Sequence, residues 1–234
     1  MNYGMTQRLA AECFGTALLV GTVVGSGIMG DRLANGNMAL ALLCNTIATA
    51  AILVTLIIVF GEISGAHFNP AVTVAVAVRK GILWAEVLPY VAVQIVGGIA
   101  GAFVAHVMFS LPVVSWSQHP RHGFALAVSE FVATFGLVCV IELCGKKRLE
   151  IIAISAGLYI AAAYWCTSST SFANPAVTIA RCFSDTFAGI RPSDVPMFVA
   201  VQIVGALTAG CFCRWILSGT TISPSTLTAI ESQE

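Results

Sequence analysis

The stretch SFANPAVTIAR, residues 171–181, repeats a pattern already present in AHFNPAVTVAV, residues 66–76. Both contain Asn-Pro-Ala-Val-Thr, and the two asparagines, Asn69 and Asn174, are 174 − 69 = 105 residues apart. Proline suits the first turn of a helix, where its missing N–H is not needed, and asparagine is a favoured N-cap. Each copy therefore predicts the start of a helix whose apolar run of about ten residues covers half a membrane.

The repetition extends beyond this pentapeptide. AECFGTALLV (11–20) is echoed by SEFVATFGLV (129–138), and VQIVGGIAG (93–101) by VQIVGALTAG (201–210). Each half then contains two membrane spans, a half-helix and a third span. Because three spans are an odd number, the second half must be inverted relative to the first. The two half-helices enter from opposite faces and meet near the midplane, N-terminus to N-terminus.

The composition agrees with a membrane location. Of the 234 residues, 58% are hydrophobic and 9% are charged, and the mean hydropathy is +0.91. A soluble domain carries about a quarter charged residues, so this surface is too poor in charge to face water. The formal net charge is zero, which gives no reason to expect nucleic acid as a partner.

Apolar runs long enough to cross a bilayer predict all-α architecture with six transmembrane helices and two re-entrant half-helices. The six runs are Leu9–Met29, Met38–Phe60, Ile82–Phe109, Phe124–Leu143, Ile151–Cys166 and Val195–Leu217. We expect one channel domain over residues 1–217, with inverted halves at 8–110 and 124–217, followed by a polar cytoplasmic tail at 218–234.

Basic residues predict the orientation in the cell (inner) membrane. With both termini in the cytoplasm, the positive-inside rule is satisfied by a modest excess of basic residues on the cytoplasmic side. That side holds Arg8, Arg79, Lys80, Lys146, Lys147, Arg148 and Arg214, and the other side holds Arg32, Arg121, Arg181 and Arg191.

The paired Asn-Pro-Ala boxes, the run SGAHFNPAVT (64–73), and a glutamate opening each half together resemble the aquaporin and glycerol-facilitator (major intrinsic protein) family. The resemblance covers Leu9 to Leu217. It implies a homotetramer with one pore per subunit, which passively conducts small uncharged solutes without a cofactor. It also implies that the pore centre is formed by Asn69, Pro70, Ala71, Asn174, Pro175 and Ala176.

The chemistry of the predicted centre is that of a barrier to cations. The N-terminus of each half-helix carries roughly half a positive charge, and both point at the same place. Asn69 and Asn174 can accept local backbone N–H groups with their carbonyls and direct their NH₂ groups into the lumen. Passing hydroxyl groups would find donors there, while cations and protons would be repelled. Asn-Pro as a mere helix start is the alternative, which the duplication makes hard to sustain.

Two carboxylates, Glu12 and Glu130, lie inside apolar spans, where they are costly unless satisfied. They could accept backbone N–H groups of the re-entrant loops, as the resemblance implies, or relay protons in a coupled transporter. Their symmetric placement favours the first role. His67 could face the pore or simply pack at its mouth. The eight cysteines form no metal-binding pattern, so no metal site is predicted, and we expect them to be buried small hydrophobic residues.

The resemblance places a selectivity filter on the extracellular side of the centre. Counting from the boxes without gaps assigns it to Thr49, Ala162, Ser171 and Val177. Val177 replaces the arginine that normally follows the second box, which removes bulk, hydrogen-bond donors and a positive charge. A wide, weakly polar filter is therefore predicted, passing glycerol, small amides and trivalent metalloid hydroxides such as arsenous acid. This pattern is similar to that of a bacterial group associated with arsenic resistance.

Arg181 lies one helical turn beyond Val177. It could supply a guanidinium to the outer vestibule, or it could extend to the interface and pair with Asp185; we favour the second possibility.

Three other function classes compete with this one. A strict water channel and a proton-coupled secondary transporter of small neutral solutes are the alternatives, and inverted repeats occur in transporters as well. An enzyme is excluded by the sequence pattern, because no nucleophile–base pair, metal-ligand spacing or phosphate-binding loop can be assembled from it.

Overall fold

The computed structural model describes residues 3–145 and 147–218, and its regular structure in those ranges is entirely helical. The membrane-length helices and the two short helices follow each other as the repeat predicts. Their bounds are α1 (Met5–Ala34), α2 (Met38–Ser64), α3 (Pro70–Val78), α4 (Trp84–Met108), α5 (Phe124–Leu143), α6 (Leu149–Cys166), α7 (Pro175–Arg181), the 3₁₀ helix η1 (Pro192–Asp194) and α8 (Val195–Ser218).

Six of these helices are long and apolar enough to cross a membrane, which confirms the predicted multi-pass architecture. Most extend past the apolar runs seen in the sequence. The first, for example, covers Met5–Ala34 where the apolar run covers Leu9–Met29. Backbone hydrogen bonding continues into the polar residues at each end, because a helix satisfies its own N–H and C=O groups wherever the side chains lie.

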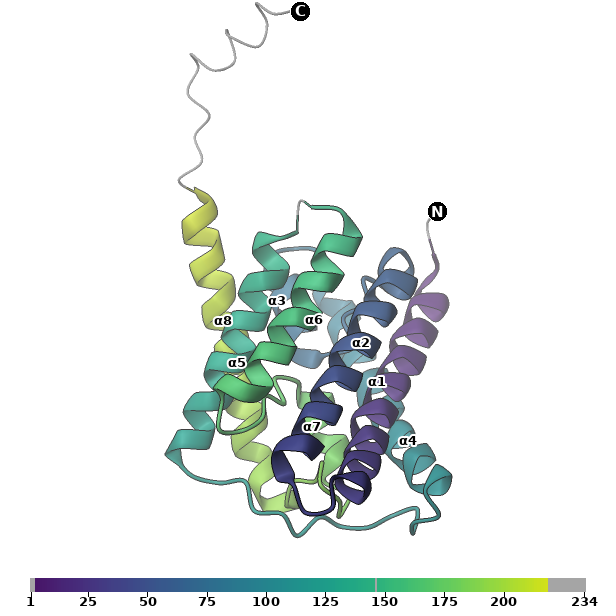
Figure 1. Ribbon diagram of the computed structural model, residues 1–234. Coiled ribbons are helices and arrows are strands. Elements are labelled where there is room, and N and C mark those ends of the chain that lie inside the picture. Colours follow the sequence, from purple (N-terminus) through teal and green to yellow (C-terminus); the bar gives the residue numbers. More distant parts are fainter. Residues whose placement is uncertain (1–2, 146, 219–234) are drawn as a thin grey trace, which may run out of the picture.

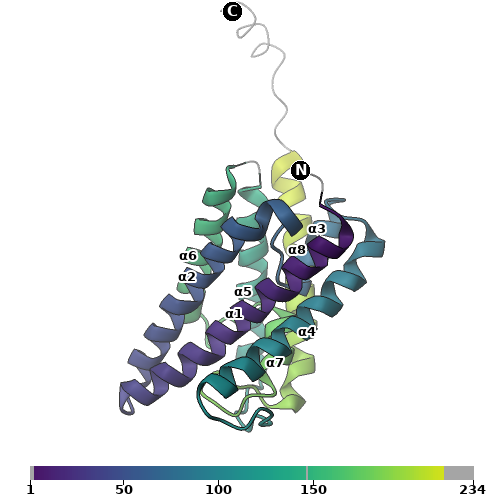
Figure 2. The ribbon, with the colours of Figure 1, turned by 90° about the vertical axis from the view of Figure 1, so that its right-hand side faces the viewer.

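The helices are arranged as two inverted halves (Figure 1). α1 begins at the face where α8 ends, which we call the terminal face, and α5 begins at the opposite face. The short helix α3 lies in the part of the molecule near the terminal face, and α7 lies toward the opposite face, in both views (Figures 1 and 2). Two half-helices entering from opposite sides thus replace one continuous span.

Close helix contacts depend on glycine within each half. A Cβ atom added at Gly97 or Gly101 of α4 would collide with the carbonyls of Cys13 and Ala17 on α1. At Gly205 of α8, it would lie 2.9 Å from the carbonyl oxygen of Phe131 on α5. Lipid provides no hydrophobic drive for association, so close packing of small residues holds these pairs together.

The loops that lead into α3 and α7 share an unusual backbone pattern. Gly65, Ala66 and Phe68 have φ of 89°, 48° and 48°, and their partners 105 residues later are also left-handed. Those partners are Thr170, Ser171 and Ala173, with φ of 61°, 51° and 47°. Left-handed non-glycine residues are unfavourable by about 1–3 kcal/mol each, so both loops need strong external support.

The cysteines are only partly buried, which corrects one prediction. Cys44, Cys166 and Cys211 are exposed on the helix surfaces, so the expectation that the cysteines are buried holds only for others, such as Cys139, Cys182 and Cys213. The apolar surroundings offered by lipid suit a cysteine as well as a protein interior does. Lys146 and the predicted tail after Ser218 lie outside the described residues.

Candidate functional site

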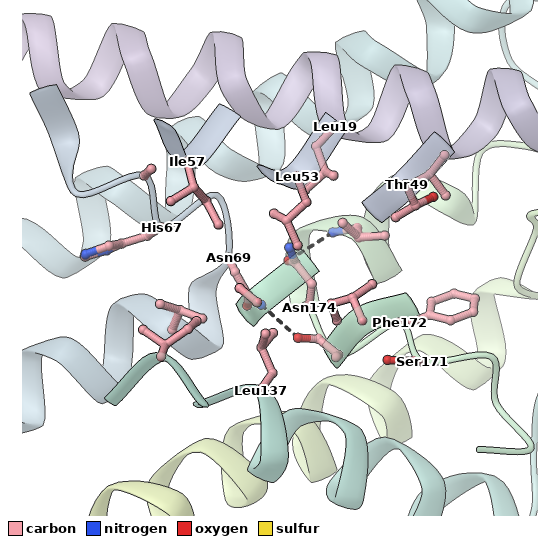
Figure 3. Close-up of a pocket in the computed structure, with 18 of the residues that line it drawn as sticks. Leu19, Thr49, Leu53, Ile57, His67, Asn69, Leu137, Ser171, Phe172 and Asn174 are labelled. Carbon is pink, nitrogen blue, oxygen red and sulfur yellow. Dashed lines mark hydrogen bonds between the residues drawn. The ribbon is translucent and has the colours of Figure 1, made fainter. Parts of the chain in front are cut away.

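The two asparagines meet where the half-helices begin. Asn69 caps α3 by accepting the Ala71 N–H at 2.9 Å, and Asn174 caps α7 by accepting the Ala176 N–H at the same distance. Each NH₂ group also reaches the other loop: Asn69 donates to the Ala173 carbonyl (Figure 3) and Asn174 to the Phe68 carbonyl, both at 2.8 Å. One N–H of each amide thus joins the halves, which leaves the second N–H available to a solute.

A cavity of about 60 Å³ passes beside this pair, with room for a short file of waters. In Figure 3, His67 lies at one end, Thr49, Ser171 and Phe172 at the other, and the asparagines between them. Much of its wall is hydrocarbon from the long helices: Leu19, Val23, Leu53, Ile57, Leu137, Ile141, Ala156 and Ile160.

Glu12 supports the first re-entrant loop from behind the cavity. It is fully buried, and its two oxygens accept the backbone N–H groups of His67 and Phe68 at 2.9 and 2.7 Å. The Ser64 hydroxyl donates to it at 2.6 Å and Gln94 Nε2 at 2.8 Å. With its lone pairs engaged in this way, the carboxylate holds the left-handed loop in place.

Glu130 does the same in the second half. It accepts the N–H groups of Phe172 and Ala173, each at 2.9 Å, and Gln202 Nε2 donates to it at 2.6 Å. Neither glutamate lines the cavity, which supports the loop-holding role over a proton relay.

Two glutamines complete this framework, and the sequence reasoning missed them. Gln94 and Gln202 are fully buried, and each also bonds a threonine of the adjacent half-helix: Gln94 donates to Thr73 at 3.0 Å, and Gln202 to Thr178 at 2.9 Å. The signal was present, because both glutamines occupy the same place in the repeated VQIVG stretch. A polar residue recurring inside a membrane span requires a partner.

His67 is partly buried and lines the cavity at the end nearer the terminal face. One ring nitrogen, Nδ1, lies 3.1 Å from the Thr73 hydroxyl, and the ring centroid is 5.4 Å from that of Tyr90. The histidine therefore lines the cavity and also packs against Tyr90. Both positions expected from the sequence, facing the pore and packing at its mouth, are partly met.

Three of the four expected filter residues, Thr49, Ser171 and Val177, line the opposite end of the cavity. The fourth assignment, Ala162, is wrong: this residue is exposed on the outside of α6, and the face toward the cavity carries Ala156, Ile160 and Tyr164. The Tyr164 hydroxyl donates to Thr49 at 3.2 Å. A buried tyrosine thus lies on the cavity wall where a small alanine was expected.

The favoured interpretation of Arg181 also needs correction. Arg181 is 3% exposed and lines the cavity, and its Nε donates to the Ala188 carbonyl. Asp185, the partner expected from the sequence, instead accepts the Gln118 backbone N–H at 2.8 Å. The side chain is instead held inside the protein by the Phe172 ring, which precedes α7, and by the Ala188 carbonyl in the loop that follows it.

Comparison with known proteins identifies the family to which this fold belongs. The family model described as major intrinsic protein matches residues 2–148 and again residues 126–233, which is one match for each half. This chain belongs to the major intrinsic protein family. The resemblance read from the paired Asn-Pro-Ala boxes is therefore confirmed. Proteins of this family are channels, so the chain is a membrane channel and not an enzyme.

Individual relatives cover nearly the whole chain. It is 50% identical over 216 residues to aquaglyceroporin AqpS of Rhizobium meliloti (strain 1021), covering 92% of both chains. It is 28% identical to aquaporin Z of Photorhabdus laumondii, covering 92% of this chain and 99% of that one. The solved aquaglyceroporin of Plasmodium falciparum superposes with a TM-score of 0.71 at 19% identity, covering 94% of this chain and 98% of the other. That likeness bears on the fold alone.

Proposed function

We propose that this chain is a passive channel for water and for small uncharged solutes, namely glycerol-like polyols and trivalent metalloid hydroxides such as arsenous acid. The channel comprises residues 1–217, forms a homotetramer with one pore per subunit, and lies in the cell membrane with both termini in the cytoplasm. The water and glycerol part of this proposal is based on the relative AqpS, which is named an aquaglyceroporin.

The observation that carries this proposal is the mixed lining of the cavity. Hydrocarbon side chains such as Leu53, Ile57 and Leu137 line it together with Asn69 and Asn174, whose amide groups can donate hydrogen bonds. A polyol has both carbon and hydroxyl groups, so it can contact the apolar wall while its hydroxyls pair with the amides. A pore of uniform polarity would leave one side of such a solute unsatisfied.

The centre of the cavity opposes cations. Two helix N-termini point their partial positive charges at it, and both asparagines present N–H groups there. A neutral solute can accept a hydrogen bond from these donors in passing, whereas a metal ion or hydronium is repelled.

A passive mechanism is favoured over a proton-coupled one. Among the cavity-lining residues of the described chain, none is an aspartate or glutamate. The two intramembrane glutamates already accept hydrogen bonds from loop N–H groups, so protonating either would remove support from a loop. A coupled transporter needs a carboxylate that can titrate without such a cost.

The solute range follows from the filter end. Val177 contributes an uncharged side chain directly after the second Asn-Pro-Ala box, which leaves room there for a three-carbon polyol or a metalloid hydroxide. The Tyr164 side chain also lines the cavity and occupies part of that space, so we expect only compact solutes to pass. A strict water channel would need this end closed further by bulk at position 177.

The test is stopped-flow light scattering on proteoliposomes of the purified full chain, with protein-free vesicles as the baseline. Water, glycerol, urea and arsenous acid are compared under equal osmotic gradients. We expect water, glycerol and arsenous acid to enter faster than through the lipid. Acceleration of water alone would overturn the solute range and leave a strict water channel.

A further inference from the structure

Arg181 is a buried cation at the wall of the cavity, one turn beyond the position where the family's arginine is missing. Its Cζ lies 3.4 Å from the centroid of the Phe172 ring, and Nε donates to the Ala188 carbonyl. A guanidinium has five N–H donors, and a buried charge is costly unless its surroundings satisfy it. The ring face and the carbonyl offset part of this cost.

A second guanidinium lies over the same ring. Arg121, from the segment between α4 and α5, has its Cζ 4.9 Å from the Phe172 centroid. It donates from Nε to the Gly189 carbonyl at 2.8 Å and from Nη1 to the Ser169 carbonyl at 3.2 Å. The loop containing Phe172 is therefore held by carbonyl and ring contacts to two cations.

Neither guanidinium has a carboxylate in ion-pair contact, although the buried Glu130 interacts electrostatically with both at longer range. Over residues 3–145 and 147–218, no ion pair includes the side chain of Arg121 or Arg181. Asp194 accepts the backbone N–H of Arg121 at 2.8 Å, but its ion-pair contacts are with Arg191, at 3.1 Å, and the His122 ring, at 3.8 Å. Arg181 consequently lines this end of the cavity without an ion pair, and Arg121 lies over the same Phe172 ring, in surroundings that screen charge poorly.

One polar group beside them lacks a partner inside the protein. The Ser171 hydroxyl is buried, lines the cavity, and makes no hydrogen bond within the described chain. A native protein rarely leaves a buried hydroxyl unpaired unless a ligand or water pairs with it. A solute hydroxyl passing this point can pair with Ser171 Oγ while the guanidinium of Arg181 offers further donors.

We infer that Arg181, held against Phe172 with Arg121 beside it, is the charge barrier and specificity-determining cation of this channel, in place of the arginine that Val177 replaces. The inference rests on the proposed channel function and deepens it. Moving the guanidinium one turn along α7 keeps cations out while freeing the space at Val177 for a solute larger than water. Arg181 then excludes cations by its charge, whereas Val177 sets the size of the solute that can pass.

The experiment measures cation leak and glycerol flux separately in proteoliposomes of the full chain. Arg181→Met removes the charge but keeps an unbranched side chain. We expect proton and K⁺ leak to rise roughly tenfold, as losing about 1.4 kcal/mol of barrier would produce, while glycerol still passes. Arg32→Met is the matched control: Arg32 is exposed near the same face and does not line the cavity, so its leak should equal that of the wild type.

Two further variants make the result decisive. Val177→Arg combined with Arg181→Met returns a guanidinium to the filter and should restore cation exclusion. Arg181→Gln keeps a donor for the Ala188 carbonyl and serves if Arg181→Met does not fold. Folded Arg181 variants with unchanged leak would overturn the inference and leave the proposed function intact. Absence of glycerol flux in the wild type would instead contradict the proposed function.

Discussion

The two halves of the molecule agree closely at the centre. Each has a half-helix capped by asparagine, a loop with three left-handed residues at matching positions, and a buried glutamate that holds that loop. Even the supporting glutamine and threonine recur, as Gln94 with Thr73 and as Gln202 with Thr178. These residues build the framework that brings two helix ends together, and the framework is the same from either side.

The halves differ at the outer ends of their half-helices. Arg79, just after α3, pairs with the buried Glu142 at 3.2 Å. Arg181, the last residue of α7, makes no ion pair in the described chain and faces the cavity. Its counterpart in the first half, at 181 − 105 = 76, is Val76. The repeated residues thus form the pore, and the unrepeated ones give one end of it a charge that the other end lacks.

The largest effect should follow from breaking the repeated framework. Glu130→Ala removes the acceptor of two buried loop N–H groups, which costs about 1–3 kcal/mol for each group left unpaired. We expect a large fall in the apparent melting temperature, measured by fluorescence-detected size-exclusion chromatography in detergent. The apparent melting temperature of the Glu12→Ala variant should fall by a similar amount, because Glu12 accepts equivalent loop N–H groups.

Glu150→Ala is the matched control for these two variants. Glu150 is exposed at the start of α6, and within the described residues its ion pair is with the exposed Arg148. Its loss should leave the melting temperature unchanged. If Glu12→Ala and Glu130→Ala were as stable as this control, the carboxylates would not be holding the loops.

A smaller effect, on transport alone, should follow from a change at the unrepeated end. Val177→Arg adds bulk and a second charge close to Arg181, so glycerol flux should fall about tenfold relative to water, equivalent to roughly 1.4 kcal/mol of added barrier. Stopped-flow light scattering gives both rates. Val177→Leu adds bulk without charge and should reduce glycerol flux less. Equal glycerol-to-water ratios in all three proteins would argue that position 177 does not shape the filter.

The smallest effects test the corrected wall of α6. Ala162 faces outward, so Ala162→Phe should leave both glycerol and water rates as they are in the wild type. Tyr164→Ala removes a ring from the cavity wall and should raise the glycerol rate modestly. A drop in glycerol flux for Ala162→Phe, with no change for Tyr164→Ala, would restore the assignment made from the sequence.

That pair of residues also shows where sequence reasoning fails. The boxes, the glutamates and Ser171 could be placed from the sequence because both loops keep the same backbone pattern at an offset of 105 residues. Ala162 lies at 57 + 105 = 162, the counterpart of the cavity-lining Ile57. However, α2 continues to Ser64 whereas α6 ends at Cys166, so the second connection is longer. Ala162 lies two residues from both Ile160 and Tyr164, which line the cavity, and two residues turn a helix by about 200°, so Ala162 faces outward.

Arg181 was misplaced for a related reason. A charged residue at the end of a short helix usually reaches water, and periodicity cannot show that a later loop will cover it. The carbonyl of Ala188 and the ring of Phe172 that receive the guanidinium come from segments on either side of α7, which only the folded chain brings together. Repetition in the sequence therefore predicts the framework well, whereas the unrepeated contacts need the structure.

The central claim, a passive pore whose framework is shared by both halves, is tested most directly by glycerol entry into proteoliposomes with and without an imposed proton gradient. The account predicts that the initial rate rises linearly with the glycerol gradient, is unaffected by the proton gradient, and stops when inside and outside concentrations are equal. Accumulation of glycerol above the external concentration, driven by protons, would contradict it and indicate a coupled transporter.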